Sequence, residues 1–272
     1  MQASECIFCL QPASFGRTLM IYENFQNIKS FVPEGGKFLN NRYGQFSHDE
    51  IVKAQISGKC FDVKNQSFIR CLSHTPELWT KALQKRTQIL YRPDISMIIG
   101  TLNIKPGSIV VESGTGSGSL SVSILRALIP NGKLFTFEFQ ENRAAQAKVE
   151  FEGLGLGSCV VSEHRDVVLS GLKHEGYNEA DAVFLDLPNP WDVIKEAFAV
   201  LKCGGVLCTF SPCIEQVQKN CLEMEKCGFG LVRTVETLAR PLFVRNTEGT
   251  MAITHDIQEE RMHTGYLSFG YK

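Results

Sequence analysis

Residues 110–119 read VVESGTGSGS, an apolar run that leads into three glycines at alternate positions. Residues 108–113 predict a buried strand, and the apolar residues within 120–128 predict a helix directly after the glycines. Glycine lets the backbone turn tightly and approach a ligand closely, and the free N–H groups of a first helical turn point at such a ligand. The stretch therefore predicts a strand–loop–helix unit of an α/β fold, with a ligand at the loop.

Strands and helices alternate on both sides of this unit. Apolar runs predict further strands at residues 133–139, 159–163, 180–185 and 205–210. Helical patterns occupy residues 93–102, 141–154, 191–201 and 214–227, and another helix starts after Thr75, with Pro76 in its first position. Apolar strands separated by helices imply a parallel sheet covered on both faces, which binds ligands beyond the carboxyl ends of its strands.

The chain closes with two predicted strands, at about 231–238 and 263–271, and no helical pattern lies between them. Two such strands predict an antiparallel pair at the edge of the sheet. This ending is more typical of methyltransferases than of dehydrogenases. No role is predicted for the polar excursion at 246–262.

Residues 1–72 have a different pattern. Short apolar runs alternate with turn signals, among them the sequence PEGG at 33–36, which predicts a small antiparallel β domain. We therefore expect two domains, a small β domain at 1–72 and an α/β domain at 73–272. Residues 1–15 match no pattern that predicts a role.

The composition is that of an ordinary globular protein. The chain has 272 residues, 43% hydrophobic and 21% charged, and 28 Lys and Arg against 29 Asp and Glu give a net charge of −1. These values exclude wholesale disorder, and no apolar run approaches the roughly 20 residues of a membrane span. The charge balance argues against a protein that holds nucleic acid by bulk electrostatics alone.

The ten cysteines do not suggest a framework of disulfides or metal ligands. Cys6 and Cys9 form a CxxC pair, but no second pair follows at zinc-finger spacing, so no metal is expected. Without a secretory signal pattern, reduced thiols in a nuclear or cytosolic protein are the expectation.

The residues around the glycines discriminate between cofactors. Glu112 stands two positions before Gly114, where its charge would repel a pyrophosphate and attract a cationic amino acid group. Ser119 stands where a dinucleotide fingerprint has Gly or Ala. Glu138, at the end of the second strand, can accept from both ribose hydroxyls, and Asp166, after the third, from an adenine amine. The set favours S-adenosyl-L-methionine over NAD.

The fourth strand passes into Asp186, followed by LPNPW at 187–191. A carboxylate that leaves an apolar strand at the switch point is placed for chemistry. Two prolines stiffen the loop, and Trp191 offers a flat surface, an arrangement typical of methyltransferases that act on a nitrogen conjugated to a base ring. The simpler alternative is that the prolines only set a turn between strand and helix, although a buried, unpaired Asp would be costly.

These motifs resemble the catalytic subunit of the tRNA (adenine-58-N1)-methyltransferase family, in its eukaryotic branch. The resemblance covers roughly residues 15–272 and rests on residues 75–80, 86–91, 112–119, 186–191, 211–217 and 263–266. It implies a class I S-adenosyl-L-methionine-dependent methyltransferase fold, Rossmann-like and mostly parallel with an antiparallel C-terminal strand pair, after a small N-terminal β domain. The implied reaction is transfer of a methyl group to N1 of adenine 58 in the tRNA T-loop.

The resemblance also implies roles for particular residues. Asp186 matches the family's catalytic aspartate. The residues expected at the cofactor are Gln88, Ile89, Leu90, Glu112, Gly114, Gly116, Ser117, Gly118, Ser119, Glu138, Arg143, Asp166 and Val167. The residues expected at tRNA are Arg42, Tyr43, Gly44, His48, Pro188, Trp191, Ser211 and Thr264. The expected partner is a non-catalytic paralogue, in a heterotetramer of two catalytic and two non-catalytic chains, and the expected compartment is the nucleus, with cytoplasm or mitochondrion as alternatives.

Three other functions compete with this interpretation. The same fold could act on another acceptor, such as a protein carboxylate or a small amine. The chain could be a non-catalytic tRNA-binding paralogue, although such a subunit could lose the glycine loop and the aspartate, and this chain has both. An NAD-dependent oxidoreductase is disfavoured by Glu112 and Ser119.

Overall fold

The computed structural model describes residues 15–24, 26–57, 61–63, 67–84, 86–247, 249–255 and 263–272. Cys6, Cys9 and the other residues of 1–14 lie outside this set. The chain divides into two compact units, one of Met1–Ile89 with Ile104–Ser170 and one of Leu90–Asn103 with Gly171–Lys272. The expected domain boundary at residue 72 stays a prediction.

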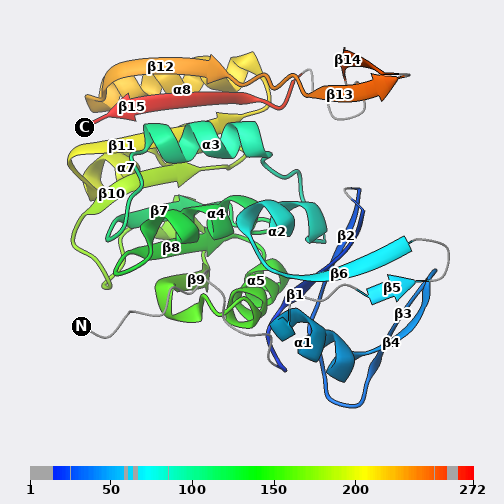
Figure 1. The fold of residues 1–272 in the computed structure, drawn as a ribbon. Coiled ribbons are helices and arrows are strands. Elements are labelled where there is room, and N and C mark those ends of the chain that lie inside the picture. Colours follow the sequence, from blue (N-terminus) through cyan, green and yellow to red (C-terminus); the bar gives the residue numbers. More distant parts are fainter. Residues whose placement is uncertain are drawn as a thin grey trace, which may run out of the picture. The chain divides into compact units, whose positions relative to one another are not determined.

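The N-terminal part of the first unit is mainly antiparallel β structure (Figure 1). One sheet has the order β2-β1-β6-β5, and β3 pairs with β4 in a separate hairpin. The strands are β1 (Leu19–Asn24), β2 (Asn27–Phe31), β3 (Phe38–Asn41), β4 (Gly44–Ser47), β5 (Phe61–Val63) and β6 (Ser67–Ser73). The predicted antiparallel strands at this end of the chain are confirmed.

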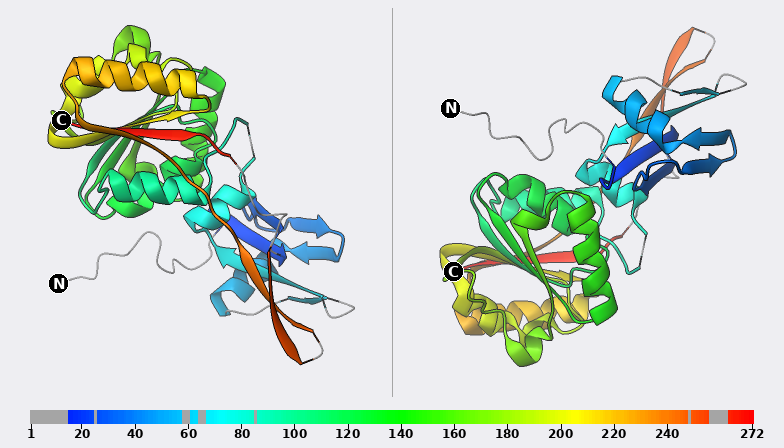
Figure 2. Two further views of the ribbon diagram at one scale, coloured as in Figure 1. Left: turned by 90° about the horizontal axis from the view of Figure 1, so that it is seen from above. Right: turned by 90° about the horizontal axis from the view of Figure 1, so that it is seen from below.

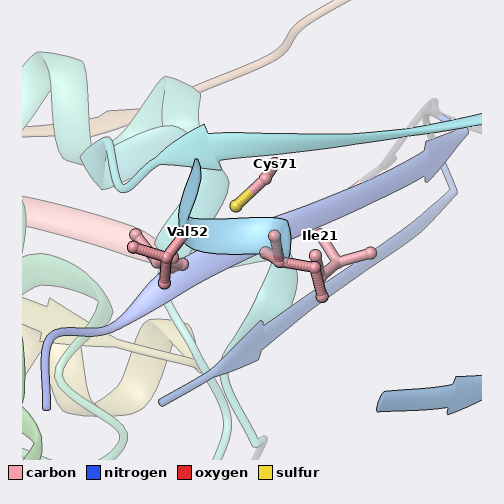
Figure 3. Packing of buried hydrophobic residues seen from close by; sticks show 5 residues of the cluster. Ile21, Val52 and Cys71 are labelled. Carbon is pink, nitrogen blue, oxygen red and sulfur yellow. The ribbon is translucent and has the colours of Figure 1, made fainter. Parts of the chain in front are cut away.

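A helix that the sequence pattern did not predict, α1 (His48–Ser57), covers this sheet. Its Ile51 and Val52 are buried in one cluster with Ile21 of β1 and Cys71 of β6 (Figure 3). A ten-residue helix is marginal on its own in water, so this apolar contact stabilises it. Burial raises the pKa of the Cys71 thiol to about 12, as expected for a packing residue.

The rest of the first unit alternates strands and helices as predicted, except that α6 and η1 below were not predicted. The strands β7 (Ile109–Ser113), β8 (Lys133–Glu138) and β9 (Val160–His164) pair in parallel. The helices are α2 (Pro76–Ala82), α4 (Ser119–Leu128), α5 (Glu141–Gly153) and α6 (Val167–Ser170), with a short 3₁₀ turn, η1, at Gly157–Cys159. Thr75 caps α2 as predicted, since its hydroxyl accepts from the N–H of Leu78 at 3.2 Å.

The second unit contains parallel strands β10 (Ala180–Leu185) and β11 (Leu201–Ser211). Its helices are α3 (Arg92–Thr101), the 3₁₀ turn η2 (Pro190–Asp192), α7 (Ile194–Val200) and α8 (Ile214–Cys227). The closing strands are β12 (Gly230–Glu236) and β15 (Tyr266–Tyr271).

The strand β15 is antiparallel to both of its neighbours, β11 and β12. The main sheet has seven strands in the order β12-β15-β11-β10-β7-β8-β9 (Figure 1). The predicted antiparallel pair is therefore present, and the reversed strand is inserted inside the sheet while β12 takes the edge. Insertion gives β15 hydrogen-bonding partners on both sides, which suits its buried residues 267–270.

A second element that the sequence pattern did not predict is a hairpin of β13 (Leu242–Thr247) and β14 (Thr250–His255). It extends beyond the end of β12 (Figure 2) and includes part of the polar excursion. Leu242, Val244, Met251 and Ile253 are exposed on it. None of the helices in the described ranges is long and apolar enough to cross a membrane.

Candidate active site

The glycine loop after β7 has a backbone conformation that residues other than glycine rarely adopt. Gly114, Gly116 and Gly118 have φ of +96°, +55° and +75°, in the left-handed region that favours glycine. A Cβ on Gly116 would lie 2.9 Å from Thr87 Oγ1. The predicted glycines are thus required by backbone conformation, and at Gly116 also by space.

The serines of the loop hold it to the segment after α2. Ser117 Oγ accepts from the N–H of Arg86 at 3.0 Å, and Ser119 Oγ lies 2.9 Å from Thr80 Oγ1 of α2. Arg86 in turn donates to both carboxylate oxygens of Glu150, at 2.6 and 3.0 Å. Both serines are buried. Their hydroxyls therefore fix the shape of the loop, and their contact with a cofactor stays a prediction.

Glu138 ends β8 and has 2% of its surface exposed. Its Oε1 accepts from Arg143 at 2.7 Å and from the N–H of Gln140 at 3.0 Å, and its Oε2 accepts from the N–H of Gly116 at 2.9 Å. The structure brings the predicted residues Glu138, Arg143 and Gly116 together. Among the hydrogen bonds of the described residues, Oε2 accepts one, so a lone pair remains for a ribose hydroxyl.

Glu112 lies beneath the loop with 1% of its surface exposed. Its Oε2 accepts from Ser121 Oγ at 2.6 Å and from Thr136 Oγ1 at 2.7 Å, and Thr136 also bonds Thr115. These hydroxyls stabilise a carboxylate that would otherwise be costly to bury. Its negative charge still disfavours a pyrophosphate at the loop, as the sequence predicts.

The remaining predicted cofactor residues have varied settings. Asp166 Oδ1 accepts from the N–H of Val168 at 2.9 Å and so caps α6, which begins at the buried Val167. Gln88 is exposed, while Ile89 and Leu90 are buried. Leu90 belongs to the second unit and the other cofactor residues to the first. A contact of these side chains with a cofactor stays a prediction.

The predicted catalytic Asp186 directly follows β10 and is half-buried. The buried thiol of Cys208 on β11 has its pKa raised by burial, and further by the charge of Asp186. Asp186 therefore lies near the middle of the sheet in the second unit, at the carboxyl end of its strand. This is where ligands of parallel sheets bind.

Helix α8 holds the loop that follows Asp186. Gln216 Nε2 donates to the carbonyl of Pro188 at 3.0 Å, and Lys219 Nζ lies 4.5 Å from the centroid of the Trp191 ring. Gln216 and Lys219 are three positions apart and so share one face of the helix. Two side chains of α8 therefore hold this loop, in addition to the stiffness that its prolines provide.

Ser211 and Thr264, which are both predicted to contact tRNA, each form a hydrogen bond with a buried residue. Ser211 has 1% of its surface exposed and accepts from Asn220 Nδ2 at 3.0 Å. Thr264 is partly exposed and donates to Asp94 Oδ1 at 3.0 Å. Thr264 thus has more surface open to a substrate than Ser211.

The four predicted tRNA residues of the first unit lie in and beside the β3–β4 hairpin. The Arg42 guanidinium stacks 4.6 Å from the centroid of the Tyr43 ring, next to Gly44 at the turn. His48 is buried, and its Nδ1 accepts from the N–H of Glu34 at 3.0 Å. Arg42 is exposed, with its Nε 3.7 Å from Glu23 Oε2, whereas the buried His48 holds the hairpin. A contact of Arg42 or Tyr43 with RNA stays a prediction.

Sequence reasoning missed several residues of this region. Asp94 reads as an ordinary acid in the first turn of a helix, and nothing in the sequence signals its burial. Asn220 carried a usable signal, because it interrupts the apolar face of α8 between the buried Val217 and Met224. Gln216 stands inside a motif of the resemblance but was given no role.

The fold and the site define a class of protein. A parallel sheet with one inserted reversed strand, a glycine loop after its first strand and carboxylates at strand ends characterise class I S-adenosyl-L-methionine-dependent methyltransferases. In agreement, a SAM-dependent O-methyltransferase from Thermotoga maritima superposes with a TM-score of 0.79 at 26% identity, over 99% of this chain and 96% of that one. A tRNA (m1A58) methyltransferase from Aquifex aeolicus shares the fold, with a TM-score of 0.71 at 24% identity, over 96% of this chain and 99% of that one.

Sequence comparison gives the family. Residues 67–253 match the family described as tRNA methyltransferase complex GCD14 subunit. A tRNA (adenine(58)-N(1))-methyltransferase catalytic subunit from Dictyostelium discoideum is 42% identical over 235 residues, 86% of this chain and 75% of the relative. The Candida albicans protein of the same description is 40% identical over 255 residues, 90% of this chain and 76% of the relative. The chain belongs to this family of tRNA methyltransferase subunits, and its cofactor is S-adenosyl-L-methionine.

Proposed function

We propose that this chain is the catalytic subunit that methylates N1 of adenine 58 in the tRNA T-loop. The named relatives support this reaction, and one observation about the chain itself carries it. The chain retains both the left-handed glycine loop and Asp186 at the carboxyl end of β10. A non-catalytic paralogue could lose either feature without losing its ability to bind tRNA.

The residues of the first unit suit S-adenosyl-L-methionine. Gly116 turns the loop at a φ of +55° and bonds Glu138, whose Oε2 retains a lone pair, and Glu112 disfavours phosphate. Glu138 and the glycine loop would hold the ribose and the methionine part. When bound, the cofactor supplies an electrophilic methyl group on a sulfonium.

Asp186 would act on the base that accepts the methyl group. Adenine N1 is a neutral nucleophile, and its ring gains positive charge as the new bond forms. A carboxylate that accepts from the exocyclic amine stabilises that charge and selects which ring edge is presented. Most of the remaining acceleration would come from positioning, for which the loop held by Gln216 and Lys219 is suited. The adenine must leave its stack to reach the site, at a cost of about a few kcal/mol.

A different acceptor is the main alternative, since the Thermotoga relative in fold is described as an O-methyltransferase. The Asp186–Trp191 loop favours a base, because it combines one carboxylate with two prolines and an aromatic ring. A protein carboxylate or a simple amine would gain little from a flat apolar surface.

The net charge of −1 bears on the partner. We infer that this chain alone binds tRNA weakly and that a more basic, non-catalytic paralogue supplies much of the phosphate contact, in a heterotetramer of two catalytic and two non-catalytic chains. The nucleus is the compartment that we propose for this complex. Native mass measurement of the purified complex tests the stoichiometry. Tight tRNA binding by the isolated chain at physiological salt would contradict the inference that the paralogue supplies much of the phosphate contact.

The catalytic assignment is tested with Asp186→Ala in the complex with its partner. We expect methylation of tRNA to fall about a hundredfold or more, because a group that stabilises developing charge is lost, while S-adenosyl-L-methionine binding by calorimetry is retained. Asp192→Ala, which removes an exposed carboxylate of η2, is the matched control and should leave turnover unchanged. A tRNA with guanosine at position 58 should accept no methyl group. Near-normal turnover by Asp186→Ala would overturn the assignment.

A further inference from the structure

Asp94 is a buried charge that the reaction described above does not use. It lies in the first turn of α3 and has 0% of its surface exposed. Its Oδ1 accepts from the hydroxyls of Thr237 and Thr264, while its Oδ2 has no hydrogen-bond partner within the described part of the chain. A buried carboxylate with one unsatisfied oxygen is costly, and such a group in a native fold needs an explanation.

The two hydroxyls that converge on Asp94 come from different segments of the second unit. Thr237 follows the end of β12, and Thr264 stands just before β15. Asp94 itself is on α3, so one carboxylate connects three segments that are far apart in the sequence. The N-terminal end of α3 favours the negative charge, which explains how the fold tolerates its burial.

Thr264 stands beside the edge where Asp186 lies. Tyr266, two positions on, pairs with Ser211 at the end of β11, and Leu185 of β10 pairs with Thr209 of the same strand. Between them, Gly265 packs closely on Phe210, because a Cβ there would lie 2.3 Å from the Phe210 ring. The backbone at Thr264 is therefore held close to the carboxyl ends of β10 and β11.

The hydrogen bond to Asp94 fixes the polarity of the Thr264 hydroxyl. A hydroxyl has one proton to donate and two lone pairs. Because Thr264 donates its proton to Asp94, only the lone pairs remain for a further partner. A group that approaches the partly exposed Thr264 must therefore bring its own proton.

We propose that Asp94 is a positioning residue, which orients Thr264 as the acceptor of a hydrogen bond from the target nucleotide of the RNA. The donor is an N–H of the base or the ribose 2′-hydroxyl. This inference rests on the proposed function, since it assumes that a nucleotide is the acceptor. It assigns no contact between Asp94 and the substrate, because Asp94 is fully buried.

The experiment measures kcat/KM for tRNA methylation by the complex carrying Thr264→Val, Thr264→Ser, Asp94→Ala and the double variant Asp94→Ala/Thr264→Val. We expect Thr264→Val to lose about five- to tenfold and Thr264→Ser to restore near-normal activity, as for one hydrogen bond. Asp94→Ala should lose about tenfold alone but less than about twofold more in the Thr264→Val background, because the two act as a unit. Thr237→Val, which removes the other donor to the same oxygen, is the matched control and should retain activity.

A tRNA with 2′-deoxyadenosine at position 58 identifies the donor. If the ribose hydroxyl is the donor, the Thr264→Val loss disappears on this substrate, and if the base is the donor, the loss persists. Full activity of Thr264→Val, or losses at Asp94 and Thr264 that simply multiply, would overturn the proposal. Failure of the proposed function is a separate result, because the unaltered complex would then not methylate tRNA at position 58.

Discussion

The glycine loop and the loop after Asp186 both follow a strand of the sheet, yet they are shaped in different ways. The glycine loop turns at three left-handed glycines, and hydrogen bonds to Glu138, Arg86 and Thr80 then hold that backbone. The loop after Asp186 contains no glycine and is held by Gln216 and Lys219 of α8. A loop that depends on left-handed glycines tolerates little substitution at those positions. A loop held by distant side chains depends on several contacts, each of which contributes modestly.

The largest effect is expected at Gly116. Gly116→Val introduces a Cβ 2.9 Å from Thr87 Oγ1 at a φ of +55°, so we expect S-adenosyl-L-methionine affinity to fall about a hundredfold, which is about 2.7 kcal/mol. Calorimetric titration measures this. Gly107→Val is the matched control, because Gly107 has a φ of +88° with open space around it. Equal losses in the two variants would show that backbone strain alone, and not the shape of the loop, is responsible.

A smaller effect is expected at Gln216. Gln216→Leu removes the hydrogen bond to the carbonyl of Pro188, so we expect kcat for tRNA to fall about fivefold, with cofactor affinity unchanged. Gln218→Leu, an exposed glutamine of the same helix, should leave kcat unchanged. If Gln216→Leu alters cofactor affinity and leaves kcat intact, the contrast between the two loops is wrong.

The smallest effect concerns His263, which lies next to Thr264. Its pKa is raised above the ordinary value, chiefly by the hydrogen bond to Glu236. Because the folded pKa is the higher one, the stabilising contribution is full below the ordinary value of 6.5 and is lost as pH rises through the folded value. NMR titration of the imidazole should show the raised pKa, and Glu236→Gln should return it toward 6.5. An unchanged titration in that variant would remove Glu236 as the cause.

Some residues of the site could be predicted from the sequence, and others could not. The glycine loop and Glu138 are local signals, because a few neighbouring residues determine a backbone conformation or the end of a strand. The burial of Asp94 and its bond to Thr264 join positions 170 apart in the sequence, and no local pattern signals such a contact. Helix α1 and the β13–β14 hairpin were missed because their local patterns are weak.

The sequence by itself determined the alternation of strands and helices, the glycine loop with its preference for S-adenosyl-L-methionine, and the resemblance to the tRNA methyltransferase family. These follow from residue spacing and from the conformations that each residue permits. Only the tertiary structure decided that β15 lies between β11 and β12, that α8 holds the loop after Asp186, and that a buried carboxylate fixes the polarity of Thr264. Each of these depends on which distant side chains fill the same space, a property of the packed chain that no segment has alone.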